Sequence, residues 1–312
     1  MDKQGIANIS VVIPTYNRYP ILVKLIENLW KQNPRPLEII VIDQTENQEA
    51  LKEKFLKKLI KENIIRYIYQ SKVSANIARN RGIKEAKGEI VLILNDDVII
   101  PEDFIKNHMK NFFDFLIVAV SGAVIEDDSG FTDIIPLRYY RKFTGWMYFP
   151  LNFSKRTEVI NLNACNMSVR RDVILRVGGF DENFTHTYFD DTDLSLRIHR
   201  LCKKKGFKTV HDPAPYLIHL KLPGGKRPSG LNEYVVADRY AWRTWLYFFI
   251  IDFYIIFVLH EVFWRIRACI LRKKNFQKPV YFFIAVWEFL LGLGGAIFFV
   301  LRGRRLGLKD IN

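Results

Sequence analysis

Runs of apolar residues alternate with amphipathic segments through the first third of the chain. Short, continuous apolar runs predict buried strands, and apolar residues three or four positions apart predict helices. Strands are expected at 9–13, 38–43, 64–69 and 89–94, and helices at 21–32, 47–62 and 75–87. Strands without a polar face that alternate with helices predict a Rossmann-like α/β fold, in which helices flank a mostly parallel sheet.

The pattern after residue 100 is less regular. We expect a strand at 158–164, a short helix at 171–176, a long helix at 190–205 and a strand within 206–220. A break rich in Pro and Gly at 222–228 ends this part of the chain. The pattern therefore predicts an α/β domain over residues 1–228 and a separate helical tail over 229–312.

The tail combines apolar stretches with basic residues. The stretches Thr244–Phe263 and Val280–Leu301 are each close to the length that spans a bilayer. Within the second, Gly292 to Gly295 is typical of close helix packing. Residues 221–312 hold 15 Lys and Arg against 6 Asp and Glu, a balance of +9 within the net +14 of the whole chain. This combination favours an anionic membrane surface over nucleic acid as a partner.

Basic residues stand at both outer ends of these stretches and in the loop 265–278 between them. A hairpin across the membrane would move the loop charges outward, which the positive-inside rule disfavours. We expect helices that lie in the membrane interface. True spans, packing on the domain and packing between the subunits of a homodimer are the alternatives.

Cysteine usage and the N-terminus bear on the compartment. The chain has three cysteines, Cys165, Cys202 and Cys269, with no CxxC pair, so the sequence does not indicate a zinc site or a disulfide framework. The first residues contain no apolar segment of the kind found in signal peptides. We expect a cytoplasmic protein, peripheral on the inner face of the cell membrane.

The first candidate site is Asn95-Asp96-Asp97, which follows the fourth predicted strand. Acidic side chains at a strand end suit Mg²⁺ or Mn²⁺, and such an ion can neutralise a bound diphosphate. Asp43 ends an earlier strand, and ligands bind at the carboxyl ends of strands in such sheets. The alternative is a helix cap and a solvated turn ahead of Pro101.

The second candidate site is Asp190-Asp191-Thr192-Asp193, at the start of the long predicted helix. The helix dipole favours acidic residues there and accounts for one or two of them without any function. Three carboxylates within four residues repel one another and need a nearby cation or a raised pKa. Such crowding is typical of functional sites.

The third candidate group follows the last predicted strand. His219 is a candidate metal ligand, although a histidine among apolar residues is more often structural. The loop that follows is glycine-rich and carries Lys226 and Arg227, which are candidate diphosphate contacts. A flexible basic loop of this kind closes over a substrate in many enzymes, and an exposed loop without a function is the alternative.

Three common motifs are absent from the sequence. No GxGxxG follows a strand, no GxxxxGK[ST] occurs, and no GxSxG occurs. The sequence thus argues against a dinucleotide enzyme, a P-loop nucleotidase and an α/β-hydrolase.

Five segments, in order, resemble motifs of the family 2 glycosyltransferases over residues 8–220. They are Val11-Val-Ile-Pro-Thr-Tyr-Asn-Arg18, Asp43, Ala75-Asn-Ile-Ala-Arg-Asn-Arg-Gly82, Leu94-Asn-Asp-Asp-Val98, and Gly178-Gly-Phe-Asp-Glu182 with Asp190-Asp-Thr-Asp-Leu-Ser-Leu-Arg197. Five motifs in the same order are far more specific than any one of them.

The resemblance implies a GT-A fold, with a donor half at about 1–100 and an acceptor half at about 101–228. It also implies an inverting transfer that depends on Mg²⁺ or Mn²⁺. The donor would be a UDP-, dTDP- or GDP-linked sugar, and the acceptor a saccharide or a lipid-linked intermediate of cell-surface glycan assembly.

The resemblance also assigns roles to residues. Asp97 would bind the metal, where His219 is the second candidate, and Asp191 would be the general base with Asp190 and Asp193 on the acceptor side. The residues expected near the donor are Pro14, Thr15, Tyr16, Arg18, Asp43, Arg79, Asn95 and Asp96.

Three departures from the family pattern matter. Asn95 replaces an acidic residue, which lowers the expected metal affinity. Gln44-Thr45-Glu46 replaces the usual small and acidic residues after the second strand, so the nucleobase of the donor stays open. Asp190 stands where Glu is usual. No QxxRW follows, so the chain resembles non-processive, rhamnosyltransferase-like members. A metal-dependent nucleotidyltransferase and a non-catalytic membrane-associated scaffold remain as alternatives.

Overall fold

The computed structural model describes residues 6–46, 54–126, 130–133, 150–184, 189–222, 239–252, 259, 262–271, 273–277 and 279–308. The chain divides into two compact units. The first comprises Met1–Phe180, Leu194–Gly225 and Leu306–Asn312, and the second comprises Asp181–Asp193 and Lys226–Arg305. The predicted domain boundary at residue 228 lies outside the described residues and stays a prediction.

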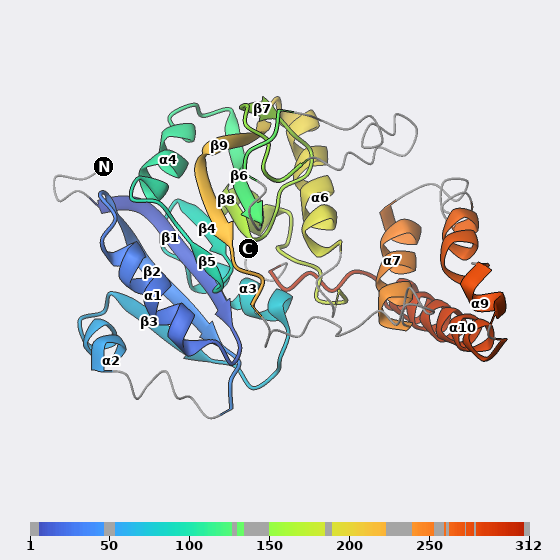
Figure 1. Ribbon diagram of the computed structural model, residues 1–312. Coiled ribbons are helices and arrows are strands. Elements are labelled where there is room, and N and C mark those ends of the chain that lie inside the picture. The colour runs from blue at the N-terminus through green and yellow to red at the C-terminus, as the bar shows by residue number, and fades with distance from the viewer. Residues whose placement is uncertain are drawn as a thin grey trace. The chain divides into compact units, whose positions relative to one another are not determined.

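The N-terminal part of the first unit is a repeated strand–helix pattern (Figure 1). Its strands β1 (Ile6–Thr15), β2 (Arg35–Asp43), β3 (Ile65–Tyr69) and β4 (Ile90–Leu94) run parallel, in the spatial order β3-β2-β1-β4. They are joined by α1 (Tyr19–Trp30), α2 (Lys54–Lys61) and α3 (Ala75–Glu85). Strands and helices are found where the apolar pattern predicts them, although residues 47–53 of the second predicted helix lie outside the described part.

The rest of the first unit extends the same sheet and makes it mixed. It adds β5 (Val98–Ile99), α4 (Phe104–Asn111), β6 (Ile117–Glu126), β7 (Thr157–Glu158), β8 (Asn166–Arg170), α5 (Arg171–Arg176), α6 (Asp190–Lys205), whose first turn belongs to the second unit, and β9 (Lys208–His219). The sheet continues in the order β4-β8-β6-β9-β5. β8 is antiparallel to both β4 and β6, whereas β9 is parallel to β6.

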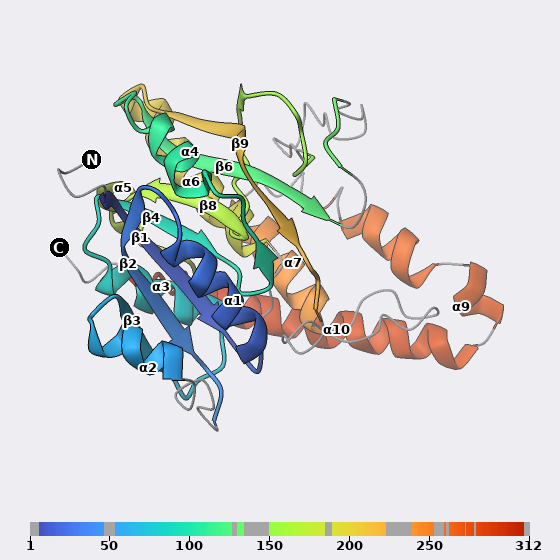
Figure 2. The ribbon, with the colours of Figure 1, turned by 60° about the vertical axis from the view of Figure 1, so that its left-hand side comes forward.

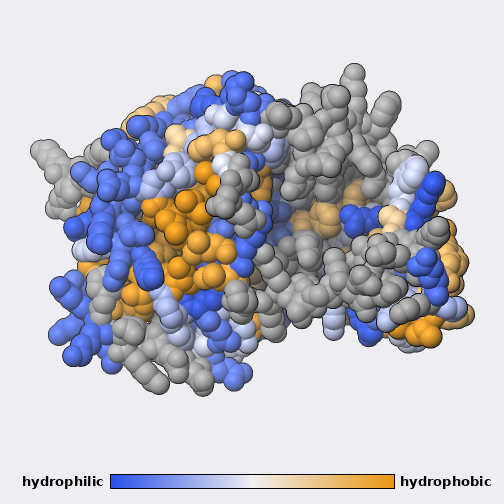
Figure 3. Space-filling model, in the orientation of Figure 1, coloured by the Kyte–Doolittle hydropathy of each residue, from blue (hydrophilic) through white to orange (hydrophobic). Residues whose placement is uncertain are grey.

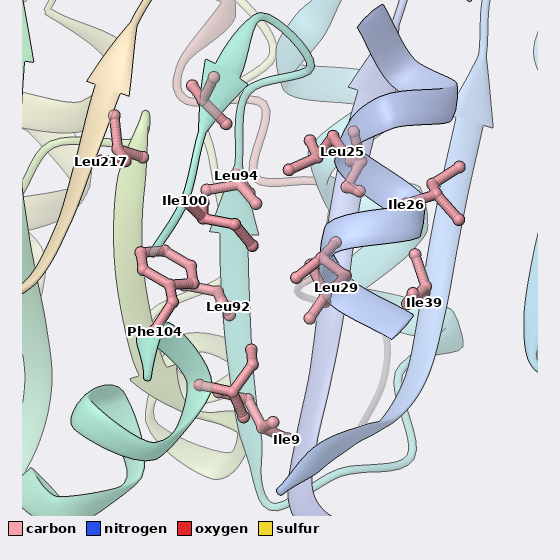
Figure 4. Packing of buried hydrophobic residues seen from close by; sticks show 14 of the residues in the cluster. Ile9, Leu25, Ile26, Leu29, Ile39, Leu92, Leu94, Ile100, Phe104 and Leu217 are labelled. Carbon is pink, nitrogen blue, oxygen red and sulfur yellow. The ribbon is translucent and has the colours of Figure 1, made fainter. Parts of the chain in front are cut away.

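Apolar side chains cover both faces of this sheet, because successive residues of a strand point to opposite sides. Ile9, Val11 and Ile13 of β1 pack with α1, α2 and α4 on one face, whereas Val12 packs with α3, α5 and α6 on the other. Figure 4 shows residues of the first cluster, with α1 beside the strands that it covers. The result is a three-layer α/β/α arrangement that holds the strand ends rigidly.

The strand predicted at 158–164 is wrong. Only Thr157–Glu158 pairs there, and the next strand begins at Asn166. Between them, side chains satisfy backbone N–H groups in place of a ladder. Leu162 N–H donates to Ser195 Oγ (2.9 Å) and Cys165 N–H donates to Asn163 Oδ1 (2.7 Å). Asn and Ser bind backbone groups in this way more readily than they join strands.

The second unit is helical over its described residues. It contains α7 (Arg239–Asp252), the π-helix η4 (Ile266–Ile270), α9 (Lys273–Gln277) and α10 (Pro279–Arg302). α7 and α10 lie side by side (Figures 1 and 2). A Cβ on Gly292 would lie 2.4 Å from Trp242 Cβ, and one on Gly295 would lie 2.7 Å from Arg243 Cδ. These glycines therefore allow the close packing that the sequence predicts.

Helix α10 is the one helix of the described residues that is long and apolar enough to cross a membrane. Its mean hydropathy is 2.2, and only 17% of its most apolar window is buried. At 3.6 residues per turn, its exposed large apolar side chains fall on one side of the helix. They are Val280, Phe283, Ile284, Trp287, Leu290, Ile297, Phe298 and Leu301. Apolar surface is visible over the α9–α10 end of this unit in Figure 3. α7, by contrast, buries Trp245 and Phe248.

The contact between α3 and β1 generates the first prediction. A Cβ on Gly82 would lie 2.2 Å from Cγ1 of the buried, stiff Val12. We expect Gly82→Ala to lower the free energy of unfolding by about 1–3 kcal/mol through overpacking. Gly294→Ala is the matched control, because no atom lies within 4 Å of the position that a Cβ would take there. Denaturant midpoints that shift equally in both variants would contradict this packing.

Candidate functional site

Three parallel strands of the first unit end beside one another, and each brings a polar side chain to the same edge. Thr15 at the end of β1 pairs in register with Asp43 at the end of β2. Asp96 and Asp97 follow β4, the neighbour of β1 on its other side. The Thr15 hydroxyl donates to Asp96 Oδ2 at 2.7 Å. All four side chains are buried. The sheet thus concentrates three carboxylates at one edge, as the sequence predicts.

Arg18 supplies positive charge to this edge. Its Nη1 lies 2.9 Å from Asp96 Oδ1 and 2.9 Å from Asp97 Oδ2, and its Nη2 donates to the carbonyl oxygen of Leu222. Burial raises the pKa of Asp96, against the opposing effects of Thr15 and Arg18. One guanidinium shared between two buried carboxylates leaves a net negative charge at the edge, which suits a further cation.

Asp97 and His219 form a second buried pair. His219 ends β9, and its Nε2 lies 3.2 Å from Asp97 Oδ1. Burial by itself raises the pKa of Asp97, but His219 and then Arg18 outweigh this effect and hold the pKa below its usual value. On the other side of the imidazole, Nδ1 lies 3.5 Å from Glu126, which also pairs with Lys221 at 3.0 Å.

The Asp97–His219 pair fits a divalent cation. Both carboxylate oxygens of Asp97 and both ring nitrogens of His219 are buried, yet none makes a hydrogen bond of normal geometry. A carboxylate and an imidazole are ligands that Mn²⁺ accepts. Among the described residues no group of three or more His, Cys, Asp and Glu side chains is arranged around one metal position.

Asp43 is held by hydroxyl groups. Tyr19 Oη donates to its Oδ2 at 3.0 Å, Tyr67 Oη donates to the same oxygen, and Thr45 N–H donates to Oδ1 at 2.9 Å. Burial, and then the Asp43 carboxylate, raise the pKa of Tyr67 above its usual value. Asp43 is thereby fixed in one orientation at the end of β2.

The neighbouring residues that are expected near the donor are also held by contacts. Gln44 accepts the Ser74 N–H at 2.6 Å, which ties the end of β2 to the start of α3. On α3 the buried Arg79 donates to Asn76 Oδ1 at 3.0 Å, and its guanidinium lies 5.1 Å from the ring centre of Phe180. Asn95 N–H donates to the Cys165 carbonyl at 3.4 Å. Pro14 and Tyr16 flank Thr15 and are partly exposed.

The acidic cluster at the start of α6 belongs to the second unit. Asp190 and Asp193 are buried, whereas Asp191 is only partly buried. Asp193 pairs with Arg304, which also lies 2.6 Å from Asp252. One of the crowded carboxylates, Asp193, is therefore paired with a cation from the end of the tail.

Two predicted site residues, Lys226 and Arg227, lie outside the described residues. Conversely, several residues near the site were not identified from the sequence. Tyr19 directly follows the first motif, and Tyr67 faces Val41 in the strand register, so inspection of the strand pattern could have suggested both. Nothing in the local sequence marks Arg304 as the partner of Asp193, because the two are 111 positions apart.

Comparison with known proteins identifies the family to which the chain belongs. Residues 10–178 match the family model described as Glycosyl transferase family 2. The match covers more than half of the chain and includes the ends of β1, β2 and β4.

Two curated relatives illustrate the similarity. The glycosyltransferase GlyG of Streptococcus pneumoniae is 37% identical over 101 residues, which are 31% of this chain and 33% of that protein. The glucosyl-dolichyl phosphate glucuronosyltransferase of Haloferax volcanii is 26% identical over 184 residues, 56% of each chain. The match thus spans from a third to just over half of these relatives.

A solved structure shows the fold. The crystal structure of GalNAc-T7 with UDP, GalNAc and Mn²⁺ superposes with a TM-score of 0.57, at 16% identity, and covers 79% of this chain and 48% of that one. The predicted GT-A class, with a long apolar helix near the C-terminus, is confirmed.

Proposed function

This chain belongs to glycosyl transferase family 2, and from that membership we propose that it moves a sugar from a nucleoside-diphosphate sugar to an acceptor hydroxyl. The observation that carries the proposal is the buried Asp97–His219 pair beside Asp96, at the edge where three parallel strands end. In an open α/β sheet this edge is where ligands bind.

The donor would be held by the residues around this edge. Asp43, whose orientation is fixed by Tyr19 and Tyr67, would contact the nucleoside, and Asp96 would contact the ribose. Their proposed neighbours around the donor are Pro14, Thr15, Tyr16, Arg18, Arg79 and Asn95. The nucleobase of the donor is left open among those of UDP, dTDP and GDP, because the side-chain oxygen of Gln44 already accepts a hydrogen bond from Ser74 N–H. Lys226 and Arg227 remain proposed contacts of the diphosphate.

Asp97 and His219 would hold Mg²⁺ or Mn²⁺. When bound, such an ion neutralises the charge of a diphosphate leaving group. The related GalNAc-T7 structure contains Mn²⁺. Glu126, on the far side of the imidazole, would orient His219 toward the ion, as carboxylates behind metal-binding histidines commonly do.

Asp191 would be the general base. A sugar hydroxyl is a poor nucleophile while it is protonated, so a positioned carboxylate that accepts the proton accelerates its attack on the anomeric carbon. Attack from the side opposite the leaving diphosphate inverts the configuration at that carbon. Asp191 is suited to this role because it is partly exposed, whereas Asp190 and Asp193 are buried.

The acceptor would be a saccharide or a lipid-linked intermediate, and the enzyme would act on the cytoplasmic face of the membrane. The exposed apolar face of α10 and the basic residues of the tail support binding to a membrane surface. Transfer is proposed to take place in a single, non-processive step, as in the rhamnosyltransferase-like members that the chain resembles. A homodimer remains a proposed assembly.

The metal site is tested by thermal stabilisation of the full chain. With UDP, GDP and dTDP tried separately, we expect Mn²⁺ to raise the melting temperature further than the best nucleotide alone, because a ligand of the native state stabilises it by mass action. Asp97→Asn and His219→Gln should lose the metal-dependent part of this shift. Asp103→Asn, which removes an exposed carboxylate nearby, should keep it. A full Mn²⁺ shift in both site variants would exclude these ligands.

The general base is tested by Asp191→Asn. Asp191 is the second residue of α6, where loss of its charge removes only a helix-dipole interaction of about 0.3–1 kcal/mol, so stability and nucleotide binding should change little. Turnover should fall roughly 10²–10⁴-fold, as expected for the loss of a general base. Asp172→Asn, at an exposed acidic residue in the first turn of α5, controls for the loss of one helix-terminal charge. Retention of more than about a tenth of wild-type turnover would rule out Asp191 as the base.

Binding to a membrane surface is tested by flotation of the full chain with vesicles. Basic residues near an anionic surface contribute about 1 kcal/mol each, so binding to anionic vesicles should exceed binding to neutral ones and weaken with salt. The double variant Phe283→Gln/Phe298→Gln, on the exposed face of α10, should bind anionic vesicles more weakly than the wild type does at the same salt concentration. Equal binding to both vesicle types, or no binding to either, would argue against electrostatic attachment to the membrane.

A further inference from the structure

The last residues of the second unit hold the acidic segment in place. Arg304, just beyond α10, directs Nη1 to Asp193 and Nη2 to Asp252 Oδ1, the latter at 2.6 Å. Both carboxylates are fully buried, and the Arg304 side chain is only 17% exposed. Removing one partner of a buried ion pair is strongly destabilising, so Arg304 contributes to the stability of this arrangement.

A second set of contacts fixes the segment that leads to the cluster. Tyr247 Oη of α7 donates to Asp181 Oδ2 at 2.6 Å, and the Arg305 N–H donates to Asp181 Oδ1 at 3.0 Å. Asn183 donates to the Gly303 carbonyl at 2.8 Å. Residues 303–305 therefore contact Asp181 and Asn183 ahead of the acidic cluster and Asp193 at its end.

A third contact fixes the residue before the helix. Phe189 adopts a left-handed backbone conformation, with φ 67°, which is uncommon for a large side chain. Its ring stacks on Phe248 of α7, with ring centres 5.0 Å apart. Its carbonyl oxygen accepts the Asp193 N–H at 2.8 Å, which closes the first turn of α6.

The helical geometry links these anchors to Asp191. Residues two apart on an α-helix point about 200° away from each other around the axis. Asp193 is anchored on the buried side, so the same turn presents Asp191 on the other side. A shift of Asp193 would move Asp191 with it, since both belong to one hydrogen-bonded turn.

We propose that Arg304 is a positioning residue, which fixes the first turn of α6 through Asp193 and Asp252 and so aims the carboxylate of Asp191. The inference rests on the proposed role of Asp191 as general base. It gives the tail a part in catalysis beyond any attachment to a membrane. Arg suits the position because its planar fork binds two carboxylates at once, which a lysine ammonium does less well.

The test compares Arg304→Met and Arg304→Lys with Arg302→Met in detergent solution, where membrane binding is not required. Arg302→Met removes the same charge from an exposed position two residues away. We expect kcat to fall about 100-fold for Arg304→Met, since a displacement near 1 Å can cost this much, with an unchanged nucleotide Kd and full binding stoichiometry. Arg304→Lys should recover part of the loss, and Arg302→Met should behave as wild type.

A coupled variant covers the case in which Arg304→Met unfolds. Asp193→Asn and Asp252→Asn combined with Arg304→Met remove both buried carboxylate charges together with their shared partner. If the three residues act as one unit, the triple variant should lose no more kcat than the worst single variant, because the effects of contacting residues are not additive. Multiplied losses in the triple variant, or a normal kcat in both Arg304 variants, would overturn the inference.

The Asp191→Asn variant in the same series separates the two proposals. If Asp191→Asn retains turnover, the general-base assignment fails, and the positioning role fails with it. If Asp191→Asn is inactive while Arg304→Lys and Arg304→Met keep a normal kcat, the base assignment stands and only the positioning role is wrong.

Discussion

Burial of carboxylates beside cations is the constraint on which this protein depends. Parallel strands bring Asp96 and Asp97 to one edge of the sheet, away from most solvent, and Arg18 offsets part of their charge. The second unit meets the same requirement with Arg304 between Asp193 and Asp252. Removing a charge from water is costly unless a partner stands close by. Such crowded sites persist where a charged ligand or a proton transfer uses them.

The sheet explains why chemistry can be concentrated at its edge. Apolar clusters on both faces hold β1, β2 and β4 in fixed register, and this register places Thr15, Asp43 and Asp96 beside one another. The acidic cluster of α6 has no such sheet behind it. Its order comes instead from long-range contacts with α7 and with the residues after α10. The acidic edge of the sheet and the acidic cluster of α6 thus rely on different kinds of scaffold.

The sequence predicts the features that depend on short stretches of chain. The apolar runs locate β1 to β4, and helical periodicity locates α6 to the residue. The strand expected at 158–164 fails because Asn163 and Ser195 bind the backbone there. At the candidate site, Asp43 and Asp97 can be recognised from the sequence, because each lies at or just after the end of a buried strand. Tyr67 on Asp43 and Arg304 on Asp193 depend on tertiary contacts, which no periodicity encodes.

The ion triad of Asp193, Arg304 and Asp252 joins three distant parts of the sequence. A chain shortened before residue 304, for example to remove the apolar helix for crystallisation, would leave two buried carboxylates without their cation. Exchange of the tail between relatives would meet the same difficulty unless the acidic segment were exchanged with it. During evolution, positions 193, 252 and 304 are therefore expected to change together, so that the tail and the acidic segment are inherited as a single module.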